Sequence, residues 1–138
     1  MNNKYALVTG ASSGIGLEIA KNLASKGHNL ILVARRKDRL IALAKNIAEK
    51  FNIKVDYISC DLSHIDAPKE IFNFCLNRDY KIELLINNAG YGIKTPFHET
   101  PMDKEEDFIR VLGTSVIALT KIFLPSMLEE GYGKIMIV

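Results

Sequence analysis

The chain has 138 residues, of which 48% are hydrophobic and 25% charged, and its formal net charge is +2. This length supports one hydrophobic core, so we treat residues 1–138 as a single domain, and the composition excludes an intrinsically disordered chain. The small net charge argues against a nucleic-acid surface, and we expect neither a signal peptide nor an apolar run near the roughly 18 residues that span a membrane.

Short apolar runs alternate with helical patterns along the chain. The runs are mostly continuous, which is typical of parallel strands covered on both faces, and they cover residues 5–8, 30–34, 55–59, 84–87 and 135–138. Apolar spacing predicts a helix that stops at Gly27, then helices over residues 40–51, 71–76 and 103–130, the last kinked or interrupted at Pro125. This order predicts an α/β fold: a doubly wound, Rossmann-type parallel sheet of five strands in a three-layer αβα arrangement.

The first predicted strand runs into TGASSGIG, residues 9–16, and then into a helix. Such a turn presents unpaired backbone N–H groups and the positive end of a helix dipole, which together bind phosphate. Gly10 permits a sharp turn, Gly14 lets the backbone approach a pyrophosphate, and Gly16 lets the helix pack closely on the sheet. The spacing differs from the common Gly-x-Gly-x-x-Gly fingerprint, and a Gly/Ser-rich turn without a ligand is the alternative.

The second strand ends in ILVARRKDRL. In NAD-binding sheets an acidic residue near this point accepts from the ribose 2′-hydroxyl, but here Ala34 stands there and is followed by Arg35, Arg36 and Lys37. Arginine is a natural partner for a 2′-phosphate. A solvated basic run is the alternative, although cations before a helix N-terminus are unfavourable until an anion binds there. We therefore favour NADP(H), with Arg35 ahead of Arg36.

The third and fourth strands also end in polar residues. Asp61, in SCDLS, can accept from the adenine amino group or can cap a turn. In NNAG, Asn87 and Asn88 would bond backbone groups and Gly90 would admit the cofactor closely, with a plain Asn/Gly turn as the alternative. Because carboxyl ends of parallel strands meet at one edge, these residues are expected to share a site.

These motifs, followed by LTKIFLPSMLEEGYGKI, resemble the short-chain dehydrogenase/reductase family in its NADP(H)-preferring branch, over all 138 residues. The resemblance implies an oxidoreductase that interconverts a carbonyl and a hydroxyl on a small substrate by hydride transfer. It also implies three sets of cofactor contacts: Gly10, Ser12, Ser13, Gly14, Ile15 and Gly16 around the pyrophosphate and adenosine ribose, Asp61 and Leu62 beside the adenine, and Asn87, Ala89 and Gly90 along the ribose.

The catalytic residues of that family are not found in these residues. The family uses a tyrosine four residues before a lysine, a serine after the fifth strand and a helix asparagine, but no tyrosine here has a lysine at that spacing, and Leu112 stands at the asparagine position. We therefore name no catalytic residue and expect the cofactor-binding half of the family domain. A dinucleotide-binding module or truncated product without turnover is the alternative. Gly113 predicts a local bulge, and Ser115 is the nearby polar side chain that could reach a water.

The long helix is apolar on more than one stripe, with Arg110 and Lys121 as the only charges between residues 108 and 128. A helix lying on a sheet buries one face, so a second stripe predicts either a homo-oligomer through residues 103–130 or a covering layer from the rest of the family domain. Cys60 and Cys75 lack metal-ligand spacing. We expect both to be buried, reduced thiols in a cytoplasmic protein with no metal site.

Overall fold

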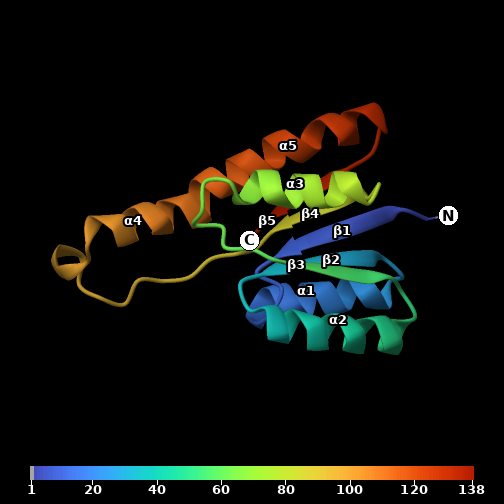
Figure 1. The fold of residues 1–138 in the computed structure, drawn as a ribbon, viewed down its shortest axis with the longest axis horizontal. Helices are drawn as coiled ribbons and strands as arrows, with labels where there is room; N and C mark the ends of the chain where they lie inside the picture. Colours follow the sequence, from blue (N-terminus) through green and yellow to red (C-terminus); the bar gives the residue numbers. More distant parts are fainter. Residues whose placement is uncertain (1) are drawn as a thin grey trace.

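The structure is a computed structural model that describes residues 2–138. Its centre is a five-stranded sheet in the order β3-β2-β1-β4-β5, and all four pairings are parallel (Figure 1). The strands are β1 (Lys4–Thr9), β2 (Asn29–Ala34), β3 (Val55–Ser59), β4 (Lys81–Asn87) and β5 (Lys134–Ile137). The predicted α/β class and the doubly wound parallel sheet of five strands are confirmed.

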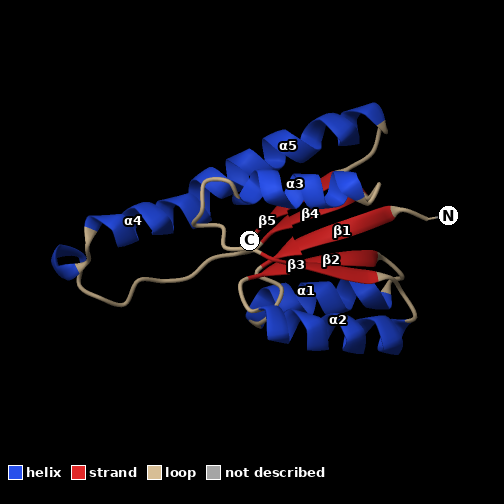
Figure 2. Cartoon of the chain, viewed as in Figure 1, coloured by secondary structure: helices blue, strands red, loops and turns tan. Residues whose placement is uncertain are grey.

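Helices cover both faces of the sheet (Figures 1 and 2). On one face lie α1 (Gly14–Ser25) and α2 (Lys37–Phe51), and on the other lie α3 (Ala67–Asn77) and α5 (Ser115–Glu129). A short 3₁₀ turn, η1 (Phe97–Glu99), leads to α4 (Met102–Ile109), which extends beyond the edge where the strands end and joins α5 through a π turn, η2 (Arg110–Thr114).

Two apolar cores lie between these layers because successive strand residues point to opposite faces. Leu7 of β1 and Leu85 of β4 face α3 and α5, in the same core as Leu119, while Val8 and Leu32 face α1 and α2. Both faces of the central strands are therefore buried, which explains why their sequences are continuous apolar runs.

The helical segment from Met102 to Glu129 corrects two sequence expectations. Gly113 lies in η2, so the predicted bulge is confirmed, but Pro125 lies inside α5 and the predicted interruption there is wrong. By length and composition this segment is also apolar enough to cross a membrane, contrary to the expectation that no such run exists. The core helix of a soluble protein passes the same test, and here Leu119, Phe123 and Met127 are buried against the sheet.

Candidate functional site

The carboxyl ends of β1, β2 and β3 are joined by short hydrogen bonds. The Ala11 N–H donates to the Val33 carbonyl at 3.2 Å, and the Cys60 N–H donates to the Ala34 carbonyl at 2.9 Å. The Ser59 hydroxyl donates to the Arg35 carbonyl at 2.8 Å. These bonds fix the loops after the three strands relative to one another, and the loops surround a cavity of about 640 Å³.

Most of the predicted cofactor contacts line this cavity. From the glycine turn come Gly10, Ser12, Ser13, Gly14 and Ile15; from the later strand ends come Arg35, Asp61, Leu62, Ala89 and Gly90. The structure places the other three predicted residues, Gly16, Arg36 and Asn87, outside the lining. The other ten lining residues were assigned no cofactor contact from the sequence: Val33, Ala34, Cys60, Ser63, Asn88, Tyr91, Lys104, Asp107, Val111 and Val138.

The glycine turn offers backbone amides to the cavity. Gly10 and Gly14 have φ values of +63° and +57°, a region that side chains disfavour, and a Cβ on Gly14 would meet open space. Ser13 precedes α1 and makes no side-chain cap hydrogen bond, so the first-turn amides of α1 are not used by its hydroxyl. A helix N-terminus in this state is a binding site for an anion.

Gly16 supports the turn from behind. A Cβ there would lie well inside contact distance of the Gly10 carbonyl oxygen and the Asn88 side-chain amide. Asn88 itself donates through Nδ2 to the carbonyls of Thr9 at 3.1 Å and Gly10 at 3.3 Å. The predicted role of Gly16 in close helix packing therefore fits the structure. The predicted bonding of backbone groups by the Asn88 side chain is confirmed, whereas the same prediction for Asn87 is wrong, because its side-chain amide bonds no described residue.

Thr9 connects the first and fourth strands, a role that the sequence reasoning missed. Its side-chain oxygen accepts the N–H groups of Asn88 and Ala89, each at 3.0 Å, and donates to the Ile86 carbonyl at 3.3 Å. The residue is 1% exposed. A hydroxyl at the last position of an otherwise apolar strand is the signal that could have found it, because a buried hydroxyl needs partners.

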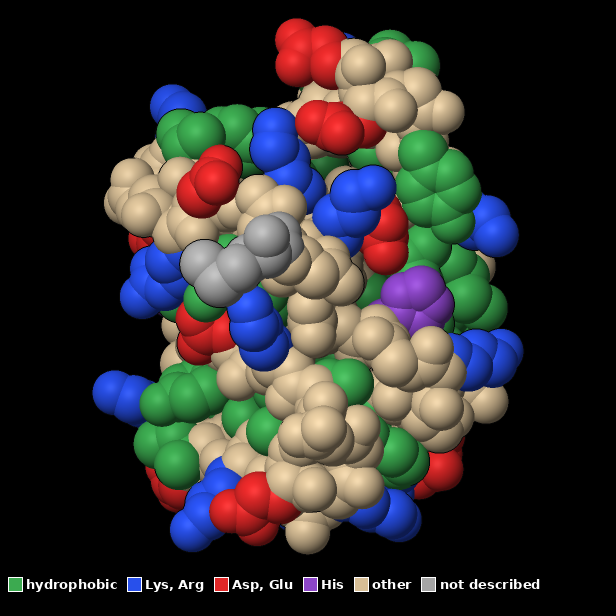
Figure 3. All heavy atoms as spheres, turned by 90° about the vertical axis from the view of Figure 1, so that its right-hand side faces the viewer, with side chains coloured by type: hydrophobic (Ala, Val, Ile, Leu, Met, Phe, Trp, Pro, Cys, Tyr) green, Lys and Arg blue, Asp and Glu red, His purple; other side chains and the backbone are tan. Residues whose placement is uncertain are grey.

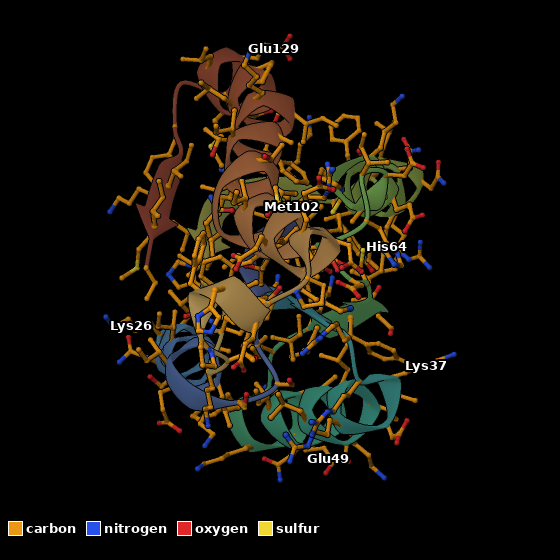
Figure 4. All side chains as sticks on the ribbon, turned by 90° about the vertical axis from the view of Figure 1, so that its left-hand side faces the viewer. Lys26, Lys37, Glu49, His64, Met102 and Glu129 are labelled. Atoms are coloured by element: carbon orange, nitrogen blue, oxygen red, sulfur yellow. The ribbon has the colours of Figure 1, made fainter. Side chains whose placement is uncertain are left out.

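Positive charge gathers where β2 ends. Arg35 lines the cavity and Arg36 lies just outside it, and within the described residues neither forms a salt bridge. The next helix, α2, begins at Lys37 and has Asp38 as the only acidic residue in its first turn. Figure 4 shows the edge where the strands end, with Lys37 and with His64, from the loop after β3, on the same side.

Asp61 holds the loop after β3. Its Oδ1 accepts the Ser63 N–H at 2.9 Å, so the predicted turn role is present. Partial burial acts to raise the pKa of the Asp61 carboxyl, but hydrogen bonds from Ser63 and the charges of His64 and Arg35 outweigh it and lower the pKa. The side chain is therefore a carboxylate that can accept from a ligand in the cavity.

The cavity wall contains the thiol of Cys60, which is not activated as a nucleophile. Burial, together with the nearby Glu70 carboxylate, raises the pKa of Cys60 to about 11, so the thiol is neutral at physiological pH. Cys60 and Cys75 are both free and buried, as predicted.

Leu112 lies over the Gly90 end of the wall. A Cβ on Gly90 would lie 2.7 Å from Leu112 Cδ2, so the two residues are in close contact and Leu112 contributes no hydrogen bond there. Ser115 is 2% exposed, and its hydroxyl donates to the Val111 carbonyl at 2.8 Å.

On the opposite edge of the sheet, where the strands begin, basic and acidic side chains lie interspersed (Figure 3).

Known proteins share both the sequence and this arrangement. Very-long-chain 3-oxoacyl-CoA reductase from Candida glabrata is 38% identical over 129 residues, which are 91% of this chain and 36% of that protein. A short-chain dehydrogenase from Sphingobium yanoikuyae in complex with NADPH superimposes with a TM-score of 0.90 at 34% identity, covering 97% of this chain and 52% of that one. L-sorbose reductase from Gluconobacter frateurii, complexed with NADPH and L-sorbose, superimposes with a TM-score of 0.89 at 29% identity, covering 99% of this chain and 54% of that one.

The chain thus spans about half the length of these solved structures and less than two fifths of the yeast reductase. Residues 4–138 match the short chain dehydrogenase family. That match covers nearly the whole sequence and includes the glycine turn and the NNAG segment. The chain belongs to the short-chain dehydrogenase family.

Proposed function

We propose that this chain carries the cofactor-binding half of an NADP(H)-dependent oxidoreductase that interconverts a carbonyl and a hydroxyl group. The observation that carries the proposal is Arg35, which lines the same cavity as the glycine turn and forms no salt bridge within residues 2–138. An acidic residue at the preceding position, where Ala34 stands, would favour NAD(H), whereas the guanidinium group of Arg35 favours a 2′-phosphate.

The residues present fit this dinucleotide. The amides of the turn around Gly14 would hold the pyrophosphate, where the backbone is open and a helix begins. Arg35 would bind the 2′-phosphate, and Asp61 with Leu62 would border the adenine. When bound, the nicotinamide supplies or accepts the hydride. The role of the protein residues described here is to bind and orient it.

The names of the relatives support a reductase. The yeast relative is named as a reductase of very-long-chain 3-oxoacyl-CoA, and a structural neighbour was solved with L-sorbose. Both names describe reductases, which supports an enzyme over a module without turnover. No tyrosine among residues 2–138 precedes a lysine by four positions, so we assign the proton transfer to none of them.

We further propose that the second apolar stripe of α5 is a subunit interface. Ile117 is 60% exposed and Leu128 is 71% exposed, and both lie on the helix face that the sheet does not cover, with Leu124 between them. Single exposed apolar residues are ordinary, but a stripe along one helix is typical of an interface.

The free, buried Cys60 and Cys75 support a reducing compartment, and we propose the cytoplasm as the location of the protein.

Binding of NADPH and NADH to Arg35→Ala tests the cofactor assignment. A hydrogen bond to a charged group contributes about 1.5–3 kcal/mol, and solvent exposure of Arg35 places the loss near the lower end, so NADPH affinity should fall roughly 10- to 30-fold. NADH affinity should not change. Lys37→Ala is the matched control, since Lys37 is exposed and lies outside the cavity lining. Equal losses for both dinucleotides, or unchanged NADPH affinity, would contradict the 2′-phosphate assignment.

A further inference from the structure

The side-chain amide of Asn87 is buried without a protein partner. Asn87 is the last residue of β4 and is 4% exposed, and neither Nδ2 nor Oδ1 has a hydrogen bond to any described residue. The adjacent Asn88 makes two bonds through its Nδ2. Leaving a buried polar group unpaired costs about 1–3 kcal/mol, so buried amides in proteins are nearly always bound by something.

The Asn87 side chain points toward α5 rather than toward the cofactor cavity. Side chains alternate along β4, so Asn87 shares a face with Leu85, which lies in the core beside Leu119 of α5. Its backbone is fully used, because it pairs with Ile137 of β5 and its carbonyl accepts the Val138 N–H at 3.0 Å. Only the amide is available, and it lies behind the cavity wall.

A polar residue occupies the matching position on the helix. A buried stripe on the helical segment is made of every fourth residue: Val111, Ser115 and Leu119. Neighbouring members of this stripe are about 6 Å apart along the helix axis. This spacing nearly matches the spacing of about 6.6 Å between alternate residues of β4 and the turn after it. Leu119 shares a core with Leu85, and Val111 lines the cavity with Ala89. Because α5 packs on β4 and runs back along it, we expect Ser115, between Val111 and Leu119 on the stripe, to lie near Asn87, between Leu85 and Ala89 on the strand.

Ser115 retains the capacity to accept a hydrogen bond. Its hydroxyl donates to the Val111 carbonyl at 2.8 Å, which leaves the oxygen lone pairs free. Ser115 directly follows the π turn η2, where one extra residue interrupts the regular ladder of helix hydrogen bonds. No direct bond joins Ser115 to Asn87, so a third group is needed to link them. A buried water makes about three hydrogen bonds to such polar groups.

We propose that Asn87 and Ser115 bind one buried water molecule that links the end of β4 to the start of α5. Nδ2 of Asn87 donates to the water, which in turn donates to the Ser115 hydroxyl oxygen. The residues on both sides of this link, Ala89 after β4 and Val111 on η2, line the cofactor cavity. The water therefore fixes the distance between two parts of the cavity wall, and Asn87 is a positioning residue rather than a cofactor contact.

The sign of the stability change in Asn87→Leu tests this proposal in the complete polypeptide. If a water satisfies the amide, removing the amide loses those bonds, and the melting temperature should fall by roughly 4–8 °C. If the amide is truly unpaired, the apolar replacement should raise the melting temperature, which would overturn the proposal. Asn29→Leu calibrates the assay: Asn29 is also buried, but its amide bonds the Lys54 N–H and the Lys4 carbonyl directly.

A high-resolution crystal structure and cofactor titration separate positioning from simple destabilisation. The crystal structure should contain a water within hydrogen-bond distance of both Asn87 and Ser115, and Ser115→Ala should displace it even if Asn87→Leu fails to fold. A protein atom bonded to the amide would overturn the proposal. Asn87→Leu should also weaken dinucleotide binding several-fold, whereas Asn29→Leu, at the other end of the sheet, should not. The water itself is observed by crystallography whichever dinucleotide binds, so this result is independent of the NADP(H) assignment.

Discussion

Substitution of Gly16 by alanine should loosen the glycine turn, although Gly16 itself lies outside the cavity lining. The new methyl group would overlap the Gly10 carbonyl oxygen, which is backbone and cannot move freely, and the Asn88 side chain. Overpacking of this kind costs about 1–3 kcal/mol. Displacing Asn88 would also weaken its bonds to the Thr9 and Gly10 carbonyls, at about 0.5–1.5 kcal/mol each. The helix preference of alanine offsets about 1 kcal/mol, so the net loss should be about 1–5 kcal/mol.

Urea unfolding measures this loss, and NADPH titration reports the turn geometry. Affinity should fall in parallel because the displaced carbonyl belongs to the turn that offers its amides to the pyrophosphate. Gly113→Ala is the matched control, since a methyl group there meets nothing within 4 Å and the backbone does not have a positive φ. It should be neutral or slightly stabilising. Wild-type stability and affinity in Gly16→Ala would refute the argument that this glycine is required by close packing.

Three further predictions address the hydroxyl, the thiols and the helix stripe. Thr9→Val should cost about 2–4 kcal/mol in urea unfolding and weaken NADPH binding, because two backbone N–H groups lose their acceptor; a neutral result would contradict this. Burial raises the pKa of Cys60 to about 11 and of Cys75 to about 12 from 9.0, so their stabilising contribution is complete below pH 9 and is lost as pH rises toward those values. Between pH 8 and 10.5 the ionisation of each thiol should lower the free energy of unfolding by about 2 kcal/mol. The free energy of unfolding of Cys75→Ala should therefore decline less steeply with pH than that of the wild-type protein, and equal slopes would contradict the raised pKa of Cys75. Ile117→Glu with Leu128→Glu should yield monomers in sedimentation experiments with unchanged NADPH affinity, and a monomeric wild-type protein would disprove the interface.

The sequence was sufficient for the doubly wound parallel sheet and for about half of the cavity lining because both depend on local signals. Continuous apolar runs mark strands buried on both faces, and residues at strand ends in a parallel sheet must share an edge. The start of β4 was placed too late because Glu83 breaks the apolar run; in the structure this carboxylate lies 3.5 Å from His28 Nδ1. Pro125 was expected to kink or interrupt its helix; the helix is not interrupted, because packing of Phe123 and Met127 in the core retains it.

Asn87 and Asn88 show where local signals end. The two residues are identical neighbours in one motif, and a sequence pattern can give them only one joint interpretation. In the sheet, successive residues point to opposite sides, so Asn88 turns toward the glycine turn and bonds the Thr9 and Gly10 carbonyls, while Asn87 turns toward α5. The alternation of side chains along the strand therefore explains why Asn88 bonds the glycine turn whereas Asn87 is buried behind the cavity wall. The surroundings of the Asn87 amide depend on α5, which begins much later in the chain, at Ser115, and only the folded arrangement brings that helix onto the sheet face that Asn87 shares.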